Sequence, residues 1–590
     1  MTKVTIEPVS KWGWLTAPRR ALVIGATGYL ALSFALFWHV WSLSPSGAAT
    51  CTCSDVAQFA WFLEWPFAAL RHGVSPLHSA AMFHPGGVNV LANTSATGLG
   101  VLLLPITALF GPLAALNVGV VVAPFASATA LMFVAQRWTR SSSAAFVAGA
   151  LYGFSPLILF HDALGHLNVT FLVVAPLVLA CFDDLFVRRR HRPGRVGLML
   201  GLLLVWQFFV GSEELVMIVV ASGFALATVA VLSQISRRGS VREAVAHARR
   251  GLVTAGAVGF VLLAGPVAYA LFGSQHYRGA VWPGRTLSND TLSGFVSARG
   301  GPSLWWDPSR WHFLPSTYLA PALVLLVLGG ALLWRRDQRL VVATVLAGVM
   351  AWLTVGPRYW FGAWHWLIHL PQMNNVVNDR FATLLFLFVA LAFCRVLDHL
   401  ASWRPSPWRF LLPVAAVVAV LAPYLDNAVH VAPFSASRVW VPTWYQVHAA
   451  TLAPGQVVLG FPLFNTSANL LAVQALYEMR YSVVGGTTPQ WLVQRQGLSA
   501  PGYGVLWDVA STSARATLAP RATSVERTQV RDALARWEVT YVVVPFTNGP
   551  NTSFVARAPV EVERWLSSVL GPPNVDSGAW VWHLGVLPAR

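Results

Sequence analysis

Residues 51–66 read Cys-Thr-Cys-Ser-Asp-Val-Ala-Gln-Phe-Ala-Trp-Phe-Leu-Glu-Trp-Pro and place two carboxylates just beyond the first long apolar run. Asp55 and Glu64 are nine residues apart, which on a helix puts them on opposite sides. Trp61 and its aromatic neighbours crowd Glu64, as aromatic residues at a membrane interface do. Asp55 stands nearer the irregular N-terminal end and is freer to face a reactant. The plain alternative is that both acids only solvate a loop.

The composition of the rest of the chain predicts a membrane protein. Hydrophobic residues make up 56% of the sequence, charged residues only 11%, and the mean hydropathy is +0.58. Apolar runs of about 18 to 20 residues recur before about residue 425, which is typical of a multi-pass α-helical protein. The formal net charge of +17 comes from Lys and Arg that cluster between these runs, where they set topology and meet anionic lipid rather than nucleic acid.

The positive charges also predict an orientation. Arg19 and Arg20 precede the first apolar run and place the N-terminus in the cytoplasm. That run lacks a small-residue cleavage site, so we expect an uncleaved first span. Residues 1–425 then form a domain of about eleven transmembrane helices. The expected spans are residues 21–41, 114–135, 144–160, 169–186, 196–210, 215–235, 252–272, 317–334, 340–356, 381–396 and 410–425.

The same orientation assigns five segments to the external face: residues 43–112, 161–168, 211–214, 273–316 and 357–380. Within them, residues 98–110 and 360–370 are apolar but too short to cross, so we expect re-entrant or surface helices there. The loop over residues 273–316 is long and rich in Trp, and we expect it to fold as a lid.

Titratable side chains gather in these external segments. Glu213 and Glu214 interrupt a long apolar run, which is costly unless they reach water, a partner or a functional site; a hairpin turn at the membrane surface is the alternative. Arg380 stands at the outer end of an expected span, where a snorkelling anchor is the alternative to a site residue. The other external candidates are His161, Asp162, His166, His276, Arg278 and Arg285.

From about residue 426 the apolar runs become too short to span a membrane, and polar and apolar residues alternate. We therefore expect residues 426–590 to form an extracytoplasmic α/β domain, with buried strands at residues 457–463, 482–486 and 539–546. Residues 523–538 have helical periodicity, with Thr523 and Glu526 spaced as a capping box. Gly485 and Gly486 lack the spacing of a phosphate-binding loop.

The cysteines and histidines indicate neither a disulfide framework nor a zinc site. Cys51 and Cys53 have a spacing that is poor for a mutual bridge, and Cys181 and Cys394 are expected near the opposite membrane face. All four cysteines are therefore predicted to be unpaired. The histidines do not stand in zinc-ligand spacing with cysteines or a glutamate.

The order of these features resembles the GT-C superfamily of integral-membrane glycosyltransferases. The resemblance rests on Ser54-Asp55 in the first external loop, on His161-Asp162 to His166 in the second, and on the segment from Pro371 to Arg380. The sequence style is similar to that of multi-pass proteins of actinobacteria. Many GT-C enzymes show paired acids at the first motif, whereas Ser54 precedes Asp55 here, so Glu213 and Glu214 remain alternatives for the catalytic acid.

The resemblance implies an inverting enzyme of the cell membrane that moves a sugar from a polyprenyl-phosphate donor to a cell-envelope glycan or glycolipid acceptor on the extracytoplasmic face. One carboxylate, expected to be Asp55, would accept the acceptor's proton, and cations would stabilise the leaving phosphate. No cofactor and no metal are expected, although Asp55 with Glu213 or Glu214 would offer oxygen ligands to a hard cation. The candidate phosphate ligands are Arg380, His161, His166, His276, Arg278 and Arg285, and the candidate acceptor-contacting or site-shaping residues are Glu64, Asp162 and Trp61.

Two other classes remain open on the sequence alone. A transporter or flippase for lipid-linked glycans would place ionisable groups near the bilayer midplane and often shows internal repeats. Here the charges fall at the outer ends of the expected spans, and the two halves show no convincing repeat. A non-catalytic cell-envelope assembly protein, whose external domain binds glycan, is the other alternative.

Overall fold

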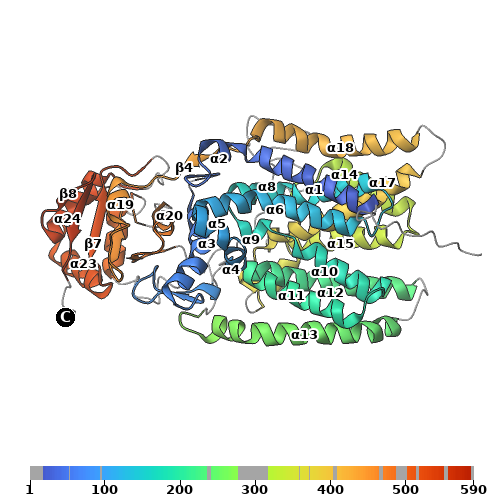
Figure 1. The fold of residues 1–590 in the computed structure, drawn as a ribbon, viewed down its shortest axis with the longest axis horizontal. Coiled ribbons are helices and arrows are strands. Elements are labelled where there is room, and N and C mark those ends of the chain that lie inside the picture. The colour runs from blue at the N-terminus through green and yellow to red at the C-terminus, as the bar shows by residue number, and fades with distance from the viewer. Residues whose placement is uncertain are drawn as a thin grey trace, which may run out of the picture.

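The computed structural model describes residues 17–51, 53–92, 96–235, 241–276, 317–357, 359–370, 373–402, 408–463, 469–486, 501–512, 517–549 and 556–585. Long helices lie side by side in a bundle, and a smaller domain with a β-sheet stands beyond one end of it (Figure 1). Helix α3 lies at that end, between the bundle and the sheet (Figure 1). The long helices come from the first part of the chain, and the sheet comes from the C-terminal part (Figure 1).

The helical part consists of long helices joined by short ones. Its helices are α1 (Ala17–Leu36), α2 (Trp38–Leu43), α3 (Ser54–His72), α4 (Thr97–Leu102), α5 (Leu104–Phe110), α6 (Pro112–Ala135), α7 (Ser142–Gly153), α8 (Pro156–Ala163), α9 (Leu167–Thr170), α10 (Val174–Phe182), α11 (Pro193–Val210), α12 (Ser212–Ile235), α13 (Val241–Phe272), α14 (Pro321–Leu333), α15 (Gln338–Thr354), α16 (Ala363–Leu367), α17 (Ala382–Ala401) and α18 (Trp408–Val431). Single turns are η1 (Val90–Ala92), η2 (Asp183–Arg188), η3 (Met373–Asn375) and η4 (Asn378–Phe381), and short strand pairs join β1 (Ala48–Ala49) to β4 (Ser437–Arg438) and β2 (His78–Ser79) to β3 (Val88–Asn89).

Among the described residues, seven helical segments are long and apolar enough to cross a membrane, or eight if the bent pair α7 and α8 counts as one span. Large apolar side chains on the outside of the bundle face the surroundings: Ile24 is 72% exposed, Phe260 74% and Leu332 78%. Such surfaces suit lipid rather than water. The protein is thus a multi-pass membrane protein.

The expected count of eleven spans remains a prediction. The three expected crossings outside the group of eight correspond to α1, α14 and α15. Helix α1 begins beside Arg19 and Arg20, while α14 and α15 have only 13 and 17 residues. The apolar segment at residues 98–110 forms the two short helices α4 and α5, and the segment at residues 360–370 contains the short helix α16, as expected.

Small residues let two helices of the bundle approach closely. A Cβ atom on Gly197 of α11 would lie 2.1 Å from the carbonyl oxygen of Gly251 in α13. Only glycine therefore fits at this crossing, and close backbone approach through small residues is a common way to pack helices in a membrane.

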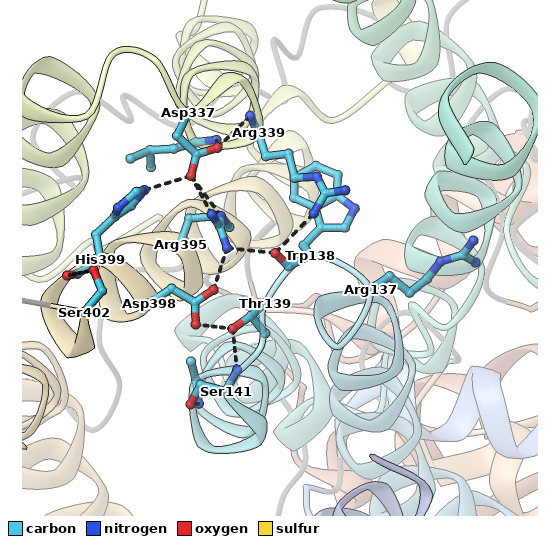
Figure 2. Close-up of polar contacts among 12 residues, drawn as sticks. Arg137, Trp138, Thr139, Ser141, Asp337, Arg339, Arg395, Asp398, His399 and Ser402 are labelled. Atoms are coloured by element: carbon cyan, nitrogen blue, oxygen red, sulfur yellow. Dashed lines mark hydrogen bonds and ion pairs between the residues drawn. The ribbon is translucent and has the colours of Figure 1, made fainter. Parts of the chain in front are cut away.

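An ion-pair network closes the end of the bundle away from the sheet (Figure 2). Arg395 donates to Asp337 at 2.7 Å and 3.0 Å, to the carbonyl oxygen of Trp138 at 2.8 Å, and pairs with Asp398. His399 Nε2 lies 2.9 Å from Asp337. Burial opposes ionisation of Asp337, but hydrogen bonds from His399 and Arg395 outweigh it and hold the pKa of this carboxyl below its usual value. The network ties α15 and α17 to the turn between α6 and α7.

The C-terminal domain is built on a five-stranded sheet with the order β6-β5-β7-β9-β8. Strand β5 runs parallel to β6 and β7, whereas β9 runs antiparallel to β7 and β8. The strands are β5 (Val457–Gly460), β6 (Ser482–Val483), β7 (Tyr541–Pro545), β8 (Asn574–Asp576) and β9 (Ala579–His583), and the helices are α19 (Thr443–His448), α20 (Asn469–Leu476), α22 (Pro501–Ala510), α23 (Ser524–Arg536) and α24 (Pro559–Leu570).

The sequence located three of these strands and one of the helices. The three expected strands correspond to β5, β6 and β7, and the capping box of Thr523 and Glu526 at the start of α23 is confirmed. The hairpin of β8 and β9 was not predicted. It adds two strands beside β7, so that β8 is an edge strand of the sheet.

The prediction of four free cysteines was wrong for the first pair. Cys51 and Cys53 form a disulfide, with their Cα atoms 5.4 Å apart, which lies within the range that a bridge spans. The chain turns between β1 and α3 and brings the two Cα atoms to this distance, which two-residue spacing alone did not suggest. Cys181 and Cys394 are unpaired, as expected, and both are buried.

Candidate active site

The first turn of α3 and the turn between α8 and α9 bring Asp55 and two histidines together. Asp55 lies in the first turn of α3, where its charge complements the positive end of the helix dipole. His166 Nε2 lies 2.9 Å from Asp55 Oδ2, and His166 Nδ1 lies 2.7 Å from His161 Nδ1. When His166 donates Nε2–H to Asp55, its Nδ1 accepts from Nδ1–H of His161. The three side chains form one continuous line.

Gly165 makes this arrangement sterically feasible. Its φ is +76°, and a Cβ atom there would lie 2.8 Å from Cγ2 of Val56 on α3. Both the left-handed backbone and the close approach favour glycine. The turn is closed by the His166 N–H, which donates to the His161 carbonyl oxygen at 2.9 Å.

A second cluster joins Arg380 to two glutamates at the start of α12. Arg380 Nη1 is ion-paired with Glu213 and lies 4.0 Å from Glu214 Oε1. The other oxygen of Glu213 accepts the backbone N–H of Val377 at 2.6 Å. Glu213 thereby holds the backbone at Val377, just before α17, and also the guanidinium of Arg380.

The two clusters belong to one region of the molecule. The charge of Arg380 lies within electrostatic range of His161. Asn168, two residues after His166, donates a long hydrogen bond of 3.5 Å to Glu214. Asn168 was not among the predicted site residues, although it lies in the external segment expected at residues 161–168.

Exposure separates the three candidate acids. The Asp55 side chain is 39% exposed, whereas Glu213 is 16% and Glu214 only 2% exposed. Glu213 is held by Arg380 and by a backbone amide. Asp55 is therefore the carboxylate of this cluster that solvent or a substrate hydroxyl reaches most readily.

Of the remaining candidates, one lies beside the histidines, one lies elsewhere, and two fall outside the described residues. Asp162 is fully buried beside His161. His276 Nδ1 lies 2.9 Å from the carbonyl oxygen of Gly273, in a segment tied to the β2–β3 hairpin through Asn89 and Ser274. Arg278, Arg285 and nearly all of the expected lid fall in residues 277–316, outside the described residues.

Trp61 and Glu64 lie where α3 meets the C-terminal domain. Trp61 Nε1 donates to Gln474 Oε1 at 2.8 Å, and the ring stacks on Trp65 with centroids 5.5 Å apart. Gln474 in turn donates to the carbonyl oxygens of Ala81 and Tyr481. Helix α3 thus carries Asp55 in its first turn, beside the histidines, and contacts the C-terminal domain through Trp61 further along.

Glu64 is a buried acid in this interface. It is 2% exposed, and Oε1 has no hydrogen-bond partner in the part of the chain that the structure describes. Burial and the neighbouring Glu478 charge raise the pKa of Glu64 to about 8, against a smaller opposing effect of Arg71. The folded protein therefore keeps Glu64 protonated at neutral pH.

We expect Glu64→Gln to stabilise the protein above neutral pH. Because the folded pKa lies above the unfolded one, wild-type stability falls as pH rises from about 4.5 to about 8, with a limiting slope of about 1.4 kcal/mol per pH unit. Glutamine has no ionisable carboxyl group, so the stability of the variant does not fall in this way. Thermal melting should show the variant more stable than wild type at about pH 9 and similar to it at about pH 5. The assignment would be contradicted if the melting temperatures of Glu64→Gln and wild type differ by the same amount at both pH values. It would also be contradicted if Glu538→Gln, which changes an exposed carboxylate, gives the same pH-dependent difference.

Among the descriptions of known protein families and the curated proteins, nothing matches this chain. Solved structures do. The arabinofuranosyltransferase AftD from Mycobacteria aligns with 98% of this chain at a TM-score of 0.52 and 14% identity. The oligosaccharyltransferase from Archaeoglobus fulgidus aligns with 91% at a TM-score of 0.50 and 13% identity. Both are GT-C membrane glycosyltransferases.

The chain has the GT-C fold. The resemblance found in the sequence is thus confirmed for the architecture. The chain spans about 40% of the mycobacterial enzyme's length and 70% of the archaeal one's. At these identities the likeness concerns the fold, and the chemistry has to be argued from the residues of this chain.

Proposed function

We propose that this protein is a membrane glycosyltransferase that moves a sugar from a polyprenyl-phosphate donor to a cell-envelope glycan or glycolipid on the extracytoplasmic face. The observation that carries the proposal is the exposed Asp55, lined up with His166 and His161, at the same end of a GT-C bundle as Arg380. A base and a phosphate-binding cation within one site are what this transfer needs.

Asp55 acts as the general base in this proposal. The acceptor oxygen attacks the anomeric carbon, its proton passes to Asp55, and the bond between the anomeric carbon and the phosphate oxygen breaks with inversion. The hydrogen bond from His166, 2.9 Å away, orients the carboxylate and stabilises its charge before the transfer. No acid is needed on the other side, because polyprenyl phosphate leaves as an anion.

Arg380 stabilises that leaving phosphate. Glu213 engages one terminal nitrogen of the guanidinium, and the buried Nε has no hydrogen-bond partner within the described ranges. Nε therefore remains as a donor for a phosphate oxygen. Glu213 holds the fork in place and is assigned a positioning role instead of the base. His161, another predicted phosphate ligand, already donates its Nδ1–H to His166 and keeps only an acceptor at Nε2, so it is not assigned a phosphate contact.

The transfer itself can be tested in proteoliposomes that contain radiolabelled polyprenyl-phosphate hexose or pentose donors and glycan or glycolipid acceptors. Transfer produces labelled acceptor and an equal amount of polyprenyl phosphate. If labelled donor instead crosses the bilayer with its sugar linkage intact, the protein is a flippase and the glycosyltransferase proposal fails.

The distribution of charge favours the enzyme over the flippase. Asn378, two residues before Arg380, donates to the Thr354 carbonyl oxygen at the last residue of α15, while Asp337 caps the first turn of the same helix. The two charged networks are thus separated by the 17 residues of α15, about 25 Å of helix. The described network residues occupy the ends of the bundle.

We further propose that the C-terminal domain is extracytoplasmic. The basic residues near Arg137, Arg188 and Arg339 gather at the end of the bundle opposite the sheet, which the positive-inside rule assigns to the cytoplasm. A reporter enzyme that is active only outside the cytoplasm, fused after residue 590, should be active. Activity of a cytoplasm-specific reporter at the same position would reverse the orientation and every site assignment that depends on it.

A further inference from the structure

A pocket of about 380 Å³ opens in the C-terminal domain, beside α19 and the β8–β9 hairpin. Four rings in contact form one of its walls. Trp444 lies with its centroid 5.3 Å from His448 and 5.7 Å from Tyr541, and Tyr541 lies 4.8 Å from His583. Trp444 is buried, while Tyr541 is half-buried and His583 is exposed. The pocket therefore has an aromatic wall in which the partly exposed rings of Tyr541 and His448 pack on the buried ring of Trp444.

Polar side chains are fixed beside this surface. His448 Nε2 lies 2.8 Å from Asp576 Oδ2, and the Ser577 hydroxyl donates to Asp576 Oδ1 at 2.8 Å. A two-residue turn with positive φ at Ser577 (47°) and Gly578 (74°) joins β8 to β9, as in the tight hairpins whose twist matches the strands. This turn holds Asp576 rigidly at the pocket. Two amide side chains, Gln456 and Asn574, also line it.

The arrangement is suited to binding and not to hydrolysis. Both Asp576 and Ser577 approach the same nitrogen, Nε2, of His448, at 2.8 Å and 3.5 Å. A nucleophile, a base and an orienting acid would need the two ring nitrogens for different partners. The described residues also contain no group of three side chains suited to a metal ion.

We infer that this pocket binds a neutral saccharide. Its volume falls in the range of about 300 to 1,000 Å³ that is usual for small-ligand sites. The C–H face of a sugar ring packs on Tyr541, and vicinal hydroxyls donate to Asp576 and accept from the amides of Gln456 and Asn574. None of the residues that line this pocket belongs to the cluster of Asp55, His166 and His161, so the two sites are distinct. The inference goes beyond the proposed transfer and does not depend on it.

The test uses the full-length protein in a detergent that contains no sugar, because maltoside detergents would compete. Linear trisaccharides of arabinose, mannose, glucose and galactose are the probes, and saturation-transfer NMR with titration gives the dissociation constants. At least one probe should bind. Asp576→Asn and Tyr541→Leu should each weaken that binding about 10-fold or more, as expected for loss of a charged hydrogen bond or a ring contact.

Two matched variants make the result decisive. Asp532→Asn removes a similar exposed carboxylate on α23, away from the pocket lining, and should bind as wild type does. Asp55→Asn should also keep saccharide binding, whether or not transfer is lost. The inference is overturned if none of the four probes binds, if Asp576→Asn and Tyr541→Leu bind normally while folded, or if Asp55→Asn abolishes binding.

Discussion

Asp55→Asn is expected to lower the rate of glycosyl transfer by about 100-fold to 10,000-fold, the usual loss when a general base is removed. Asparagine has the size of aspartate and keeps an oxygen that accepts from His166 Nε2, which lies 2.9 Å from Asp55 in the wild type. The line to His161 should therefore survive, and the protein should still insert and fold. What disappears is a carboxylate that can take the acceptor's proton.

The measurement is the single-turnover transfer rate of wild type and Asp55→Asn, with donor binding and thermal stability determined on the same samples. Asp532→Asn, at an exposed carboxylate of α23, is the matched control and should transfer at the wild-type rate. Wild-type turnover by Asp55→Asn would remove Asp55 from the role of base. Glu213 or Glu214 would then be the next candidate, despite the contact of Glu213 with Arg380.

The sequence predicted which polar residues share one face better than it predicted the contacts between them. Asp55, His161, His166 and Arg380 were expected on one face because their loops alternate with apolar runs and basic clusters, and that order is a local property of the sequence. The structure does bring these four residues into one region. The C-terminal strands and the cap of α23 were also readable from local patterns.

The pairing of Arg380 with Glu213 could not be read in this way. These residues are 167 positions apart, and their contact depends on how α12 packs beside the segment before α17. The same holds for Glu64, whose neighbour Glu478 belongs to the C-terminal domain. The disulfide between Cys51 and Cys53 required the local turn geometry, which spacing does not specify. Long-range packing determines the environments of Arg380 and Glu64, whereas the disulfide depends on local backbone geometry.

Arg380→Lys is expected to raise the donor concentration needed for half-maximal transfer by about 10-fold to 100-fold, the effect of losing one or two charge-assisted hydrogen bonds. Lysine keeps the positive charge and can still pair with Glu213, but it lacks the Nε donor and the planar fork. The guanidinium Nε of Arg380 is buried and has no hydrogen-bond partner within the described part of the chain. Loss of this N–H group should therefore weaken the use of the polyprenyl-phosphate sugar more than it weakens folding.

The matched control is Arg395→Lys. Arg395 is an ion-paired arginine with the same side-chain exposure, 18%, in the network at the other end of the bundle. Replacing it should lower thermal stability, because it disturbs the contacts with Asp337 and the Trp138 carbonyl (Figure 2), and should leave the donor dependence unchanged. Transfer rate against polyprenyl-phosphate-sugar concentration, with melting in the same detergent, separates the two effects. If Arg380→Lys behaves as wild type in both measurements, Arg380 is a snorkelling anchor, and the phosphate ligands must be sought among His276, Arg278 and Arg285.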